Sequence, residues 1–446
     1  MRTLRQIFGV TLVTLRALVR TKTVPALALL LLLCVILLPR LITGDGTPAG
    51  AFTILLTYTL GFAFGVLCLV TLIAACGLFA AEIDSTRIHL TVVKPLTTFQ
   101  LWLGKWLALV MLSVTLLTGI YALVYAQIML NMRQPAWKEE VQLVSRHVVH
   151  PTLPSLDEEA RLIYAEMYRQ NALPTNRTER QILSTLAARA HDRYDVINPG
   201  ESMKWLFTVP QPLASNSVVT VRIRFDTEYS TRTKVIGGCR LATTAHPNEG
   251  IEIDVNDLTQ NEIVFDVDLR AFNGLSPTGF ELSFQHRGDP EKSAGLMVRP
   301  RQDVALLTTA SSFEANLVRA LIVQGSILAL LAAFGLMLGA CFSLPVALFA
   351  ALILLVVVQI GESVVDITSD EDTEVLSNQI GLWVSEAATT LTAHAEAGAP
   401  LEALAHGEAI ERERIVQNLL WNVLGTPLLF ALISAGILRR RELAND

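Results

Sequence analysis

Residues 24–39 read VPALALLLLLCVILLP and residues 346–361 read VALFAALILLVVVQIG, and neither stretch contains a charged side chain. A helix that spans a bilayer needs about 20 mostly apolar residues. The whole chain has 446 residues, of which 52% are hydrophobic and 17% are charged, which is too apolar for an ordinary soluble domain. We therefore predict an α-helical polytopic membrane protein.

Six windows are long and apolar enough to span: about 24–43, 51–79, 106–130, 317–342, 344–361 and 415–438. The alternative for each is a helix buried in a soluble core, but charge-free runs of this length are rare there. The first window is also open to reading as a cleaved signal peptide. Its apolar run is long and no convincing cleavage site follows closely, so we predict a retained helix.

Basic residues indicate the orientation of these spans. They gather in three places: Arg2, Arg5, Arg16, Arg20 and Lys22; Arg87, Lys94 and Lys105; and Arg439, Arg440 and Arg441. The positive-inside rule places all three clusters in the cytoplasm if six spans are present. Residues 131–312 and the acidic stretch 362–414 then lie outside, and both chain ends lie inside.

The first 22 residues predict a helix on the membrane surface. In a helical projection Arg2, Arg5, Arg16 and Arg20 form one stripe, and Leu4, Ile7, Leu15 and Leu18 lie opposite it. The alternative is a basic flank that only sets topology, because Leu12 and Val13 interrupt the pattern. Residues 23–130 then hold the first three spans, 313–361 the next two, and 415–446 the last span with a basic tail.

Residues 131–312 are long enough to fold as an inserted α+β domain. We predict helices within 150–200, starting with a capping box of Ser155 and Glu158, and β-strands within 203–305. Alternation places three sets of residues on one face of a strand each: Val219, Val221, Ile223 and Phe225; Ile263, Phe265, Val267 and Leu269; and Phe280, Leu282 and Phe284. This pattern favours an antiparallel β-sandwich, for which a jelly roll is one open arrangement.

The same region shows no pattern of catalysis or metal binding. His147, His150, His246 and His286 lack the spacing of metal ligands, and no serine or cysteine lies in a nucleophile motif. Only Cys239 of the five cysteines lies there, which excludes a disulfide framework within the domain. We expect no enzyme activity and no cofactor in this chain, and nothing in the sequence indicates nucleic acid binding.

The loop between the second and third windows carries the most specific motif. The stretch AAEIDSTRIHLTVVKPLTTFQLWLGKWLAL, residues 80–109, resembles the cytoplasmic loop of ABC-2 type transporter permeases, and GILRRREL, residues 436–443, is similar to the usual end of that family. The motif positions are Glu82, Ser85, Thr86, Leu90, Lys94, Pro95, Gly104 and Lys105. Two positions depart from the pattern: Ser85 stands where glycine is more frequent, and Thr98 where arginine is frequent.

The resemblance implies that residues 81–105 are the coupling loop that docks on a separate ATP-binding subunit. This chain has no phosphate-binding loop of its own, because Phe99 replaces the leading glycine and Trp106 the final Ser/Thr. ATP and magnesium then belong to the partner ATPase. Six spans make half of a pathway, so the resemblance also implies a second permease copy or paralogue, an export function and a bacterial inner membrane.

Elementary geometry fits such a loop. Pro95 ends a rigid element, and Thr97 or Thr98 caps the next helix. Gly104 permits a close approach and Lys105 is expected at the lipid boundary. For Glu82, contact with the ATPase, contact with the surface helix and a simple solvated charge all remain open.

Further polar features are compatible with several roles. NQIGLWVSEAATTLTAH, residues 378–394, predicts a helix that dips back toward the bilayer as an outer gate, or a surface decoration. Gln324, Asn418 and Asn422 lie inside spans, and we expect helix packing more than substrate contact from them. Arg319 is expected to reach the interface or to pair with Glu314.

Two other functional classes remain: a non-transporting scaffold that anchors an extracytoplasmic binding module, and a mechanotransmitting ABC protein. The extracytoplasmic domain would then bind another protein or an envelope polymer. The structured basic cytoplasmic loop argues against a scaffold, and the domain's position after the third span argues against a mechanotransmitter.

Overall fold

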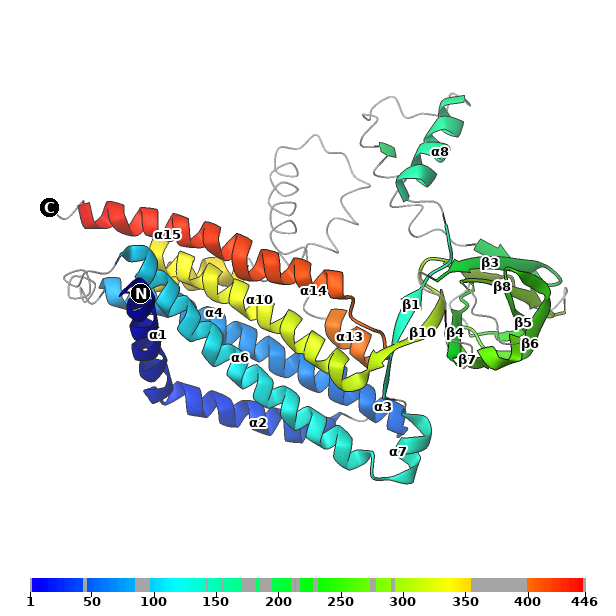
Figure 1. Cartoon of the computed structure of the whole chain (residues 1–446), viewed down its shortest axis with the longest axis horizontal. Coiled ribbons are helices and arrows are strands. Elements are labelled where there is room, and N and C mark those ends of the chain that lie inside the picture. The colour runs from blue at the N-terminus through cyan, green and yellow to red at the C-terminus, as the bar shows by residue number, and fades with distance from the viewer. Residues whose placement is uncertain are drawn as a thin grey trace. The chain divides into compact units, whose positions relative to one another are not determined.

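The computed structural model describes residues 2–42, 46–84, 97–141, 143–153, 156–169, 182–183, 186, 195–209, 213, 217–227, 232–272, 278–289, 293–353 and 399–443. The chain divides into two compact units, a helical unit of Met1–Leu143 with Ser312–Asp446 and a β unit of Val144–Ser311. Each has its own hydrophobic core. Figure 1 shows the elements of both.

The helical unit contains α1 (Arg2–Arg20), α2 (Thr23–Leu41), α3 (Pro48–Thr53), α4 (Leu60–Asp84), α6 (Thr98–Asn131), α7 (Pro135–Glu140), α10 (Phe313–Cys341), α13 (Ala399–Ala405), α14 (Arg412–Leu419) and α15 (Thr426–Leu443). Two π-helical turns join elements, η1 (Ile54–Thr59) between α3 and α4, and η3 (Leu420–Gly425) between α14 and α15.

Five helices among the described residues are long and apolar enough to cross a membrane: Val24–Leu41, Pro48–Ala80, Thr98–Asn131, Phe313–Cys341 and Arg412–Leu438. They match five of the six predicted windows. For the sixth, 344–361, a shorter apolar helix is described over Leu344–Ile353, and the rest of the window lies outside the described residues.

Helix α10 is the centre of the helical unit and contacts α4, α6 and α15. Small residues bring α10 close to α4. A Cβ atom added at Gly335 would lie 2.6 Å from Ala75 Cβ, and one added at Gly339 would collide with the carbonyl oxygen of Cys76. Glycines four residues apart on one face let two helix backbones approach, which is how helices pack in lipid.

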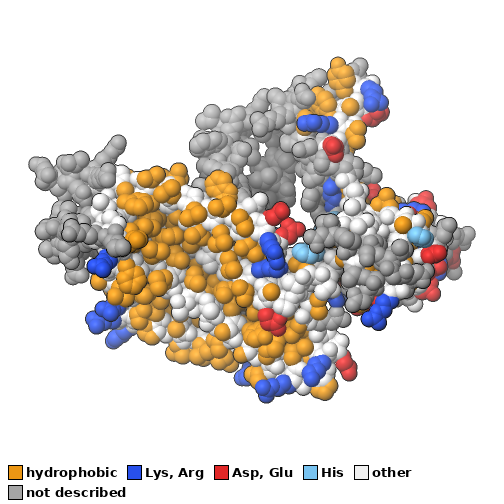
Figure 2. All heavy atoms as spheres, viewed as in Figure 1, with side chains coloured by type: hydrophobic (Ala, Val, Ile, Leu, Met, Phe, Trp, Pro, Cys, Tyr) orange, Lys and Arg blue, Asp and Glu red, His pale blue; other side chains and the backbone are white. Residues whose placement is uncertain are grey.

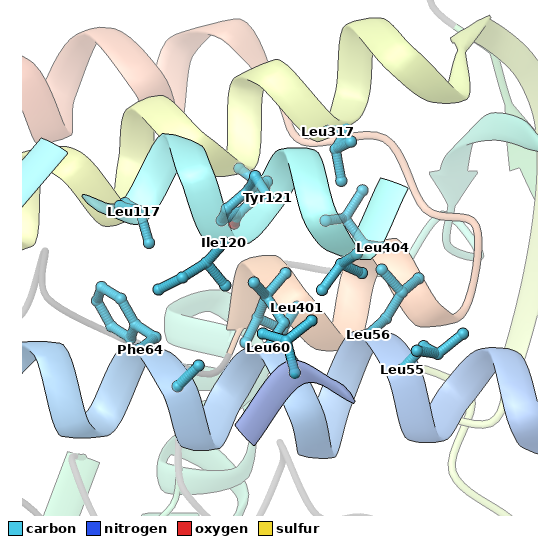
Figure 3. Packing of buried hydrophobic residues seen from close by; sticks show 14 of the residues in the cluster. Leu55, Leu56, Leu60, Phe64, Leu117, Ile120, Tyr121, Leu317, Leu401 and Leu404 are labelled. Carbon is cyan, nitrogen blue, oxygen red and sulfur yellow. The ribbon is translucent and has the colours of Figure 1, made fainter. Parts of the chain in front are cut away.

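Large apolar side chains fill the core at the α3 end of the helical unit and also cover its outside. Figure 3 shows Leu56 and Leu60 facing Leu117 and Leu317 across this core. Many equally large side chains are exposed, including Leu37, Phe62 and Leu428. Figure 2 shows such hydrophobic side chains spread over the helices. An apolar exterior of this extent fits a lipid environment.

The β unit contains β1 (Val144–Val149), β2 (Asp195–Ile197), β3 (Ser202–Thr208), β4 (Val218–Arg224), β5 (Lys234–Thr243), β6 (His246–Leu258), β7 (Glu262–Asp268), β8 (Gly279–His286), β9 (Leu296–Val298) and β10 (Val304–Ser312), together with α8 (Leu156–Arg169) and the short 3-10 helix η2 (Leu269–Phe272). Helix α8 buries Ala160 against Ile182 and Leu186. The predicted cap Ser155 lies outside the described residues.

Two four-stranded sheets share one core. Their strand orders are β1-β10-β4-β7 and β3-β8-β5-β6, and β2 pairs with β9 separately. All but one of the alternating residues predicted to face inward are buried: Val219, Val221, Ile223 and Phe225 in and after β4, Ile263, Val267 and Leu269 in and after β7, and Phe280, Leu282 and Phe284 in β8. The exception, Phe265 in β7, is half-buried and packs against the same core. If the eight sheet strands are counted in chain order, the sheets read 1-8-3-6 and 2-7-4-5, which is the order of a jelly roll.

Candidate functional site at the two ends of the helical unit

The first end is where α4 stops at Asp84 and α6 starts at Thr98. Thr97 caps α6: its Oγ1 accepts from the Gln100 amide at 3.2 Å, and Gln100 Oε1 accepts from the Thr97 amide at 3.0 Å. This reciprocal pair is a capping box, so the predicted cap is Thr97 rather than Thr98. The capping box therefore fixes where α6 begins, within the predicted coupling loop of residues 81–105.

Helix α1 packs against α6 at this end. A Cβ atom at Gly104 would lie 2.6 Å from Val10 Cγ1 and 3.2 Å from the Ile7 carbonyl oxygen, so only glycine allows the observed approach. Gly104 thus has the predicted role, and its partner is α1. Thr11 and Thr14 are buried on the same side of α1.

The remainder of α1 is exposed in two neighbouring stripes. Arg5, Arg16 and Arg20 are exposed, and so are the large apolar residues Leu4, Phe8 and Val19. The side chain of Arg2 lies outside the described residues. A helix fixed to α6 by one face, with adjacent apolar and cationic stripes on the rest, suits the boundary between lipid tails and anionic headgroups. The sequence pattern assigned Ile7 to the apolar stripe of a surface helix. It did not reveal that the part of α1 around Ile7 packs against α6.

Lys105 differs from its prediction. Its side chain is 2% exposed rather than at the lipid boundary. The Nζ atom donates to the Leu78 carbonyl at 3.1 Å and lies 4.0 Å from the centre of the Phe79 ring. Carbonyl and ring both stabilise the buried cation. Lys105 therefore joins the start of α6 to the last part of α4, on either side of the loop.

The rest of the predicted coupling motif is not positioned. Ser85, Thr86, Leu90, Lys94 and Pro95 lie outside the described residues, and Glu82 lies in the last turn of α4 with its side chain outside them. The side chains of Arg439, Arg440 and Arg441 in α15 are also outside. Figure 1 shows α1, the end of α4, the start of α6 and the end of α15 at the same end of the helical unit.

At the other end of the helical unit, α13 packs into the hydrophobic core. Leu401 and Leu404 are 3% and 0% exposed and join the core of η1, α6 and α10 (Figure 3). The helix predicted over 378–394 lies outside the described residues. α13 belongs to the same 362–414 segment and inserts into the unit just after it. The acidic segment 362–414 therefore contributes two leucines to the core of the helical unit.

Asn316 binds the chain that follows α13, and the sequence pattern did not predict this role. Its side chain is 1% exposed. Its Nδ2 donates to the Glu408 carbonyl at 2.6 Å, and its Oδ1 accepts from the Ile410 amide at 2.9 Å. Arg319 Nη1 also donates to the Ile410 carbonyl at 3.4 Å. One amide thereby satisfies two backbone groups of the chain that follows α13.

The amides predicted to lie inside spans, Gln324, Asn418 and Asn422, are all buried, and two of them make contacts between helices. Gln324 Oε1 accepts from Tyr121 Oη at 2.9 Å, and Asn422 Nδ2 donates to Ser326 Oγ at 3.3 Å. Asn418 is 3% exposed on α14. Asn422 lies in the π-helical turn η3, a rare conformation that often occurs at functional sites. The described contacts of Gln324 and Asn422 are those of helix packing.

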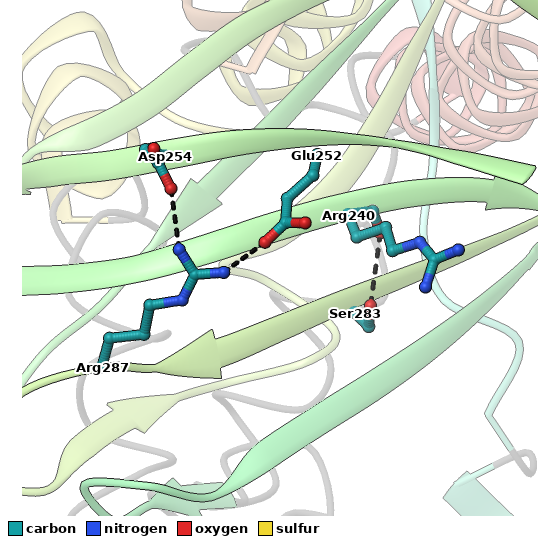
Figure 4. Close-up of polar contacts among 5 residues, drawn as sticks. All are labelled: Arg240, Glu252, Asp254, Ser283 and Arg287. Atoms are coloured by element: carbon teal, nitrogen blue, oxygen red, sulfur yellow. Dashed lines mark hydrogen bonds and ion pairs between the residues drawn. The ribbon is translucent and has the colours of Figure 1, made fainter. Parts of the chain in front are cut away.

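The β unit carries a polar cluster on its outer face (Figure 4). Arg287 donates to Asp254 Oδ1 at 2.8 Å and also pairs with Glu252. Gly238 lies under the guanidinium, where a Cβ atom would be 2.8 Å from Arg287 Nη2. All three charged side chains are substantially exposed, so these pairs contribute little to stability.

Two titratable side chains of the β unit, His286 and Cys239, are buried within the sandwich. His286 is 1% exposed, and its ring contacts three backbone groups: Nδ1 lies 3.0 Å from the Gly288 amide nitrogen and 3.2 Å from the Ile236 carbonyl oxygen, and Nε2 lies 3.3 Å from the Ala294 carbonyl oxygen. Burial raises the pKa of the Cys239 thiol to about 12. Within the described residues no group of three or more His, Cys, Asp or Glu is arranged to hold a metal.

Comparison with known proteins adds no relative. No family model, no curated protein and no solved structure matches the chain.

Proposed function

We propose that the chain is the permease subunit of an ABC-2 type exporter in a bacterial inner membrane. It forms half of the membrane pathway, pairs with a second permease copy, and is driven by a separate ATP-binding subunit. The observation that carries the proposal is the ordered motif of residues 82–105. Its two described flanks, the end of α4 and the start of α6, are joined by Lys105, and the start of α6 packs against α1.

Such a joint has the mechanical property that coupling needs. A docking element transmits force only if the spans beside it do not yield separately. Thr97 fixes the helix start, Lys105 ties it to α4, and Gly104 seats α1 on the same helix. Any movement imposed between residues 84 and 97 therefore acts on three helices together.

The connectivity supports six crossings. The last part of α10 packs on α4 near Leu72 and Cys76, whereas α13 packs near Leu56 and Leu60 at the other end of α4. The chain between Cys341 and Ala399 thus joins opposite ends of the helical unit. In this proposal the apolar window 344–361 is one further crossing, with α1 and the end of α15 on the cytoplasmic side and residues 131–312 outside.

In this proposal α13 is part of the outer gate. It closes the end of the unit opposite the coupling motif, and hydrogen bonds of Asn316 retain the chain after it. Release of Leu401 and Leu404 from the core would open that end.

The test is co-purification from the native membrane. The wild-type protein is expected to recover an ATPase with a phosphate-binding loop. Glu82→Arg, or deletion of residues 86–93, should lose that ATPase while the chain stays folded. Lys138→Glu, an exposed charge reversal on α7 at the other end, is the matched control and should keep it. Undiminished ATPase recovery with both coupling-loop variants contradicts the coupling assignment, and recovery of the chain alone favours the scaffold.

One observation favours the mechanotransmitter alternative. β10 ends at Ser312 and α10 begins at Phe313, so no linker residue separates strand and span. A short Gly-Ser insertion between Ser311 and Ser312 keeps the Ser312 cap on the Ala315 amide. An exporter should tolerate this insertion, whereas a mechanotransmitter should lose the effect of ATP on its outer domain.

A further inference from the structure

A cavity of about 690 Å³ lies within the helical unit, where α2 and α6 end. It is bounded by the last turns of both helices, by the start of α3 with η1, and by α7. Gly46, with a φ of 81°, turns the chain between α2 and α3 and forms part of the wall. The volume is within the range of small-molecule and lipid-headgroup sites.

The polar part of the wall carries one positive charge. Arg40, Gln127, Asn131 and Gln134 line the cavity, and none of the described lining residues is acidic. Gln127 donates to the Val35 carbonyl at 3.1 Å and so holds α6 to α2. Within the described residues Arg40 forms no ion pair. A guanidinium among carboxamides attracts an oxyanion.

The remaining wall is apolar and comes from the spans themselves. Ile36, Ile54, Leu55 and Leu130 face the same cavity. Arg40 lies in the last turn of α2, whose apolar window ends at Leu41, and Asn131 is the last residue of α6. Arg40 and Asn131 therefore lie where the two spans end. Ile36, Ile54 and Leu55 lie one to two turns deeper, where the amide of Gln127 also lines the wall.

We infer that this cavity binds an anionic phospholipid of the leaflet in which α2 and α6 end. The phosphate accepts hydrogen bonds from Arg40 and from the amide donors, and the acyl chains follow the apolar wall into the bilayer. This division into a charged rim and an apolar depth matches an amphiphile better than a free ion, since the apolar wall would leave a free ion poorly solvated. The inference uses the membrane placement proposed above but not the exporter function.

Trp137 lines the cavity and is 7% exposed, which provides a probe. The full-length protein is placed in nanodiscs that contain increasing fractions of brominated phosphatidylglycerol or brominated phosphatidylcholine, and tryptophan quenching is measured. Subtracting the signal of Trp137→Phe removes the contribution of the other tryptophans. We expect the Trp137 signal to be quenched at about tenfold lower mole fraction of the anionic lipid, which is the effect of one charged hydrogen bond.

Arg40→Gln should abolish this preference, and Arg40→Lys should retain part of it. Arg133→Gln is the matched control, because Arg133 is exposed near the same end of α6 but does not line the cavity. Equal quenching by both lipids overturns the inference, and so does an unchanged preference in Arg40→Gln. Displacement by millimolar inorganic phosphate would show that the oxyanion site takes a free ion rather than a lipid. If the wild-type protein recovers no ATPase but still prefers the anionic lipid, the exporter proposal is refuted and the lipid site is retained.

Discussion

The two units place their large apolar side chains differently. The β unit buries phenylalanines between its sheets, with Phe225, Phe280 and Phe284 all fully buried, and shows polar pairs such as Lys204 with Glu281 at 2.7 Å outside. The helical unit exposes Phe62 and Leu428, and brings helices together through Gly335 and Gly339. The first arrangement is stabilised by transfer of apolar surface out of water. The second relies on close packing and interhelical hydrogen bonds, as expected where the surroundings are as apolar as the core.

The largest expected effect is in the β unit. Phe284→Ala removes a ring that packs 4.5 Å from the Phe225 ring, and should cost about 3–5 kcal/mol of unfolding free energy. In the full chain, the thermal transition of the β signal by circular dichroism should fall strongly while the helical transition stays in place. Val264→Ala, at a 51% exposed position, is the control. A joint shift of both transitions would show that the units do not unfold separately.

Gly339→Ala tests the packing of the helical unit. The added methyl group meets the Cys76 carbonyl, which is backbone and cannot rotate away, so α4 and α10 must separate. We expect a loss of about 3 kcal/mol, at the upper end of overpacking effects. Gly436→Ala, where a Cβ atom meets nothing within 4 Å, should be neutral when helical melting is compared in detergent. Equal stability of the two variants would refute the close contact.

Asn316→Ala removes two hydrogen bonds to the chain after α13. About 2 kcal/mol of local stability should be lost, at about 1 kcal/mol for each neutral bond. Hydrogen exchange of the amides of residues 401–410 should become faster, while exchange in the α4–α10 contact stays the same. Unchanged exchange at the Ile410 amide would mean that the Asn316 side chain does not stabilise the chain after α13.

Excision of the β unit should have a still smaller effect on its stability. Residues 144–311 carry their own core, so they are expected to express as a soluble monomer with a mainly β circular dichroism spectrum. The transition should lie within a few degrees of that in the full chain. A random-coil spectrum would show that this core depends on the helical unit.

Acid should weaken the β unit slightly through Asp257. The Asn261 side chain and the Leu258 amide both donate to this carboxylate and lower its pKa. A folded pKa below the usual value of about 3.9 gives a stabilisation that is complete above that value and is lost as the pH falls through the lowered one. Asp257→Ala should flatten this part of the pH profile of melting, and Glu262→Ala should not. The effect is small because the group is almost fully exposed.

Local patterns predicted the strands and most helices well. Alternation identified the buried faces of β4, β7 and β8, and Thr97 was recognisable as a cap from its position after Pro95. The Gly335–Gly339 spacing is also visible in the sequence and is a known packing signal in membrane helices. These features depend on neighbours within one helix or strand.

Features that depend on distant chain segments were not accessible. Asn316 bonds Glu408 and Ile410, about 90 residues away, and nothing in its own surroundings distinguishes it from another polar residue near a helix start. Lys105 was placed at the lipid boundary because long cations usually reach water there. Its burial follows from Leu78 and Phe79, whose positions depend on how α4 packs beside α6.

The strand order of the β unit has an architectural consequence. β1 and β10, the first and last strands of residues 144–311, are neighbours in one sheet. The chain therefore enters and leaves this unit through two strands that lie side by side, about one strand spacing or roughly 5 Å apart. A unit with adjacent ends behaves as a cassette: it can be exchanged for another outer domain, or replaced by a tight turn, without changing the distance that the two flanking spans must bridge.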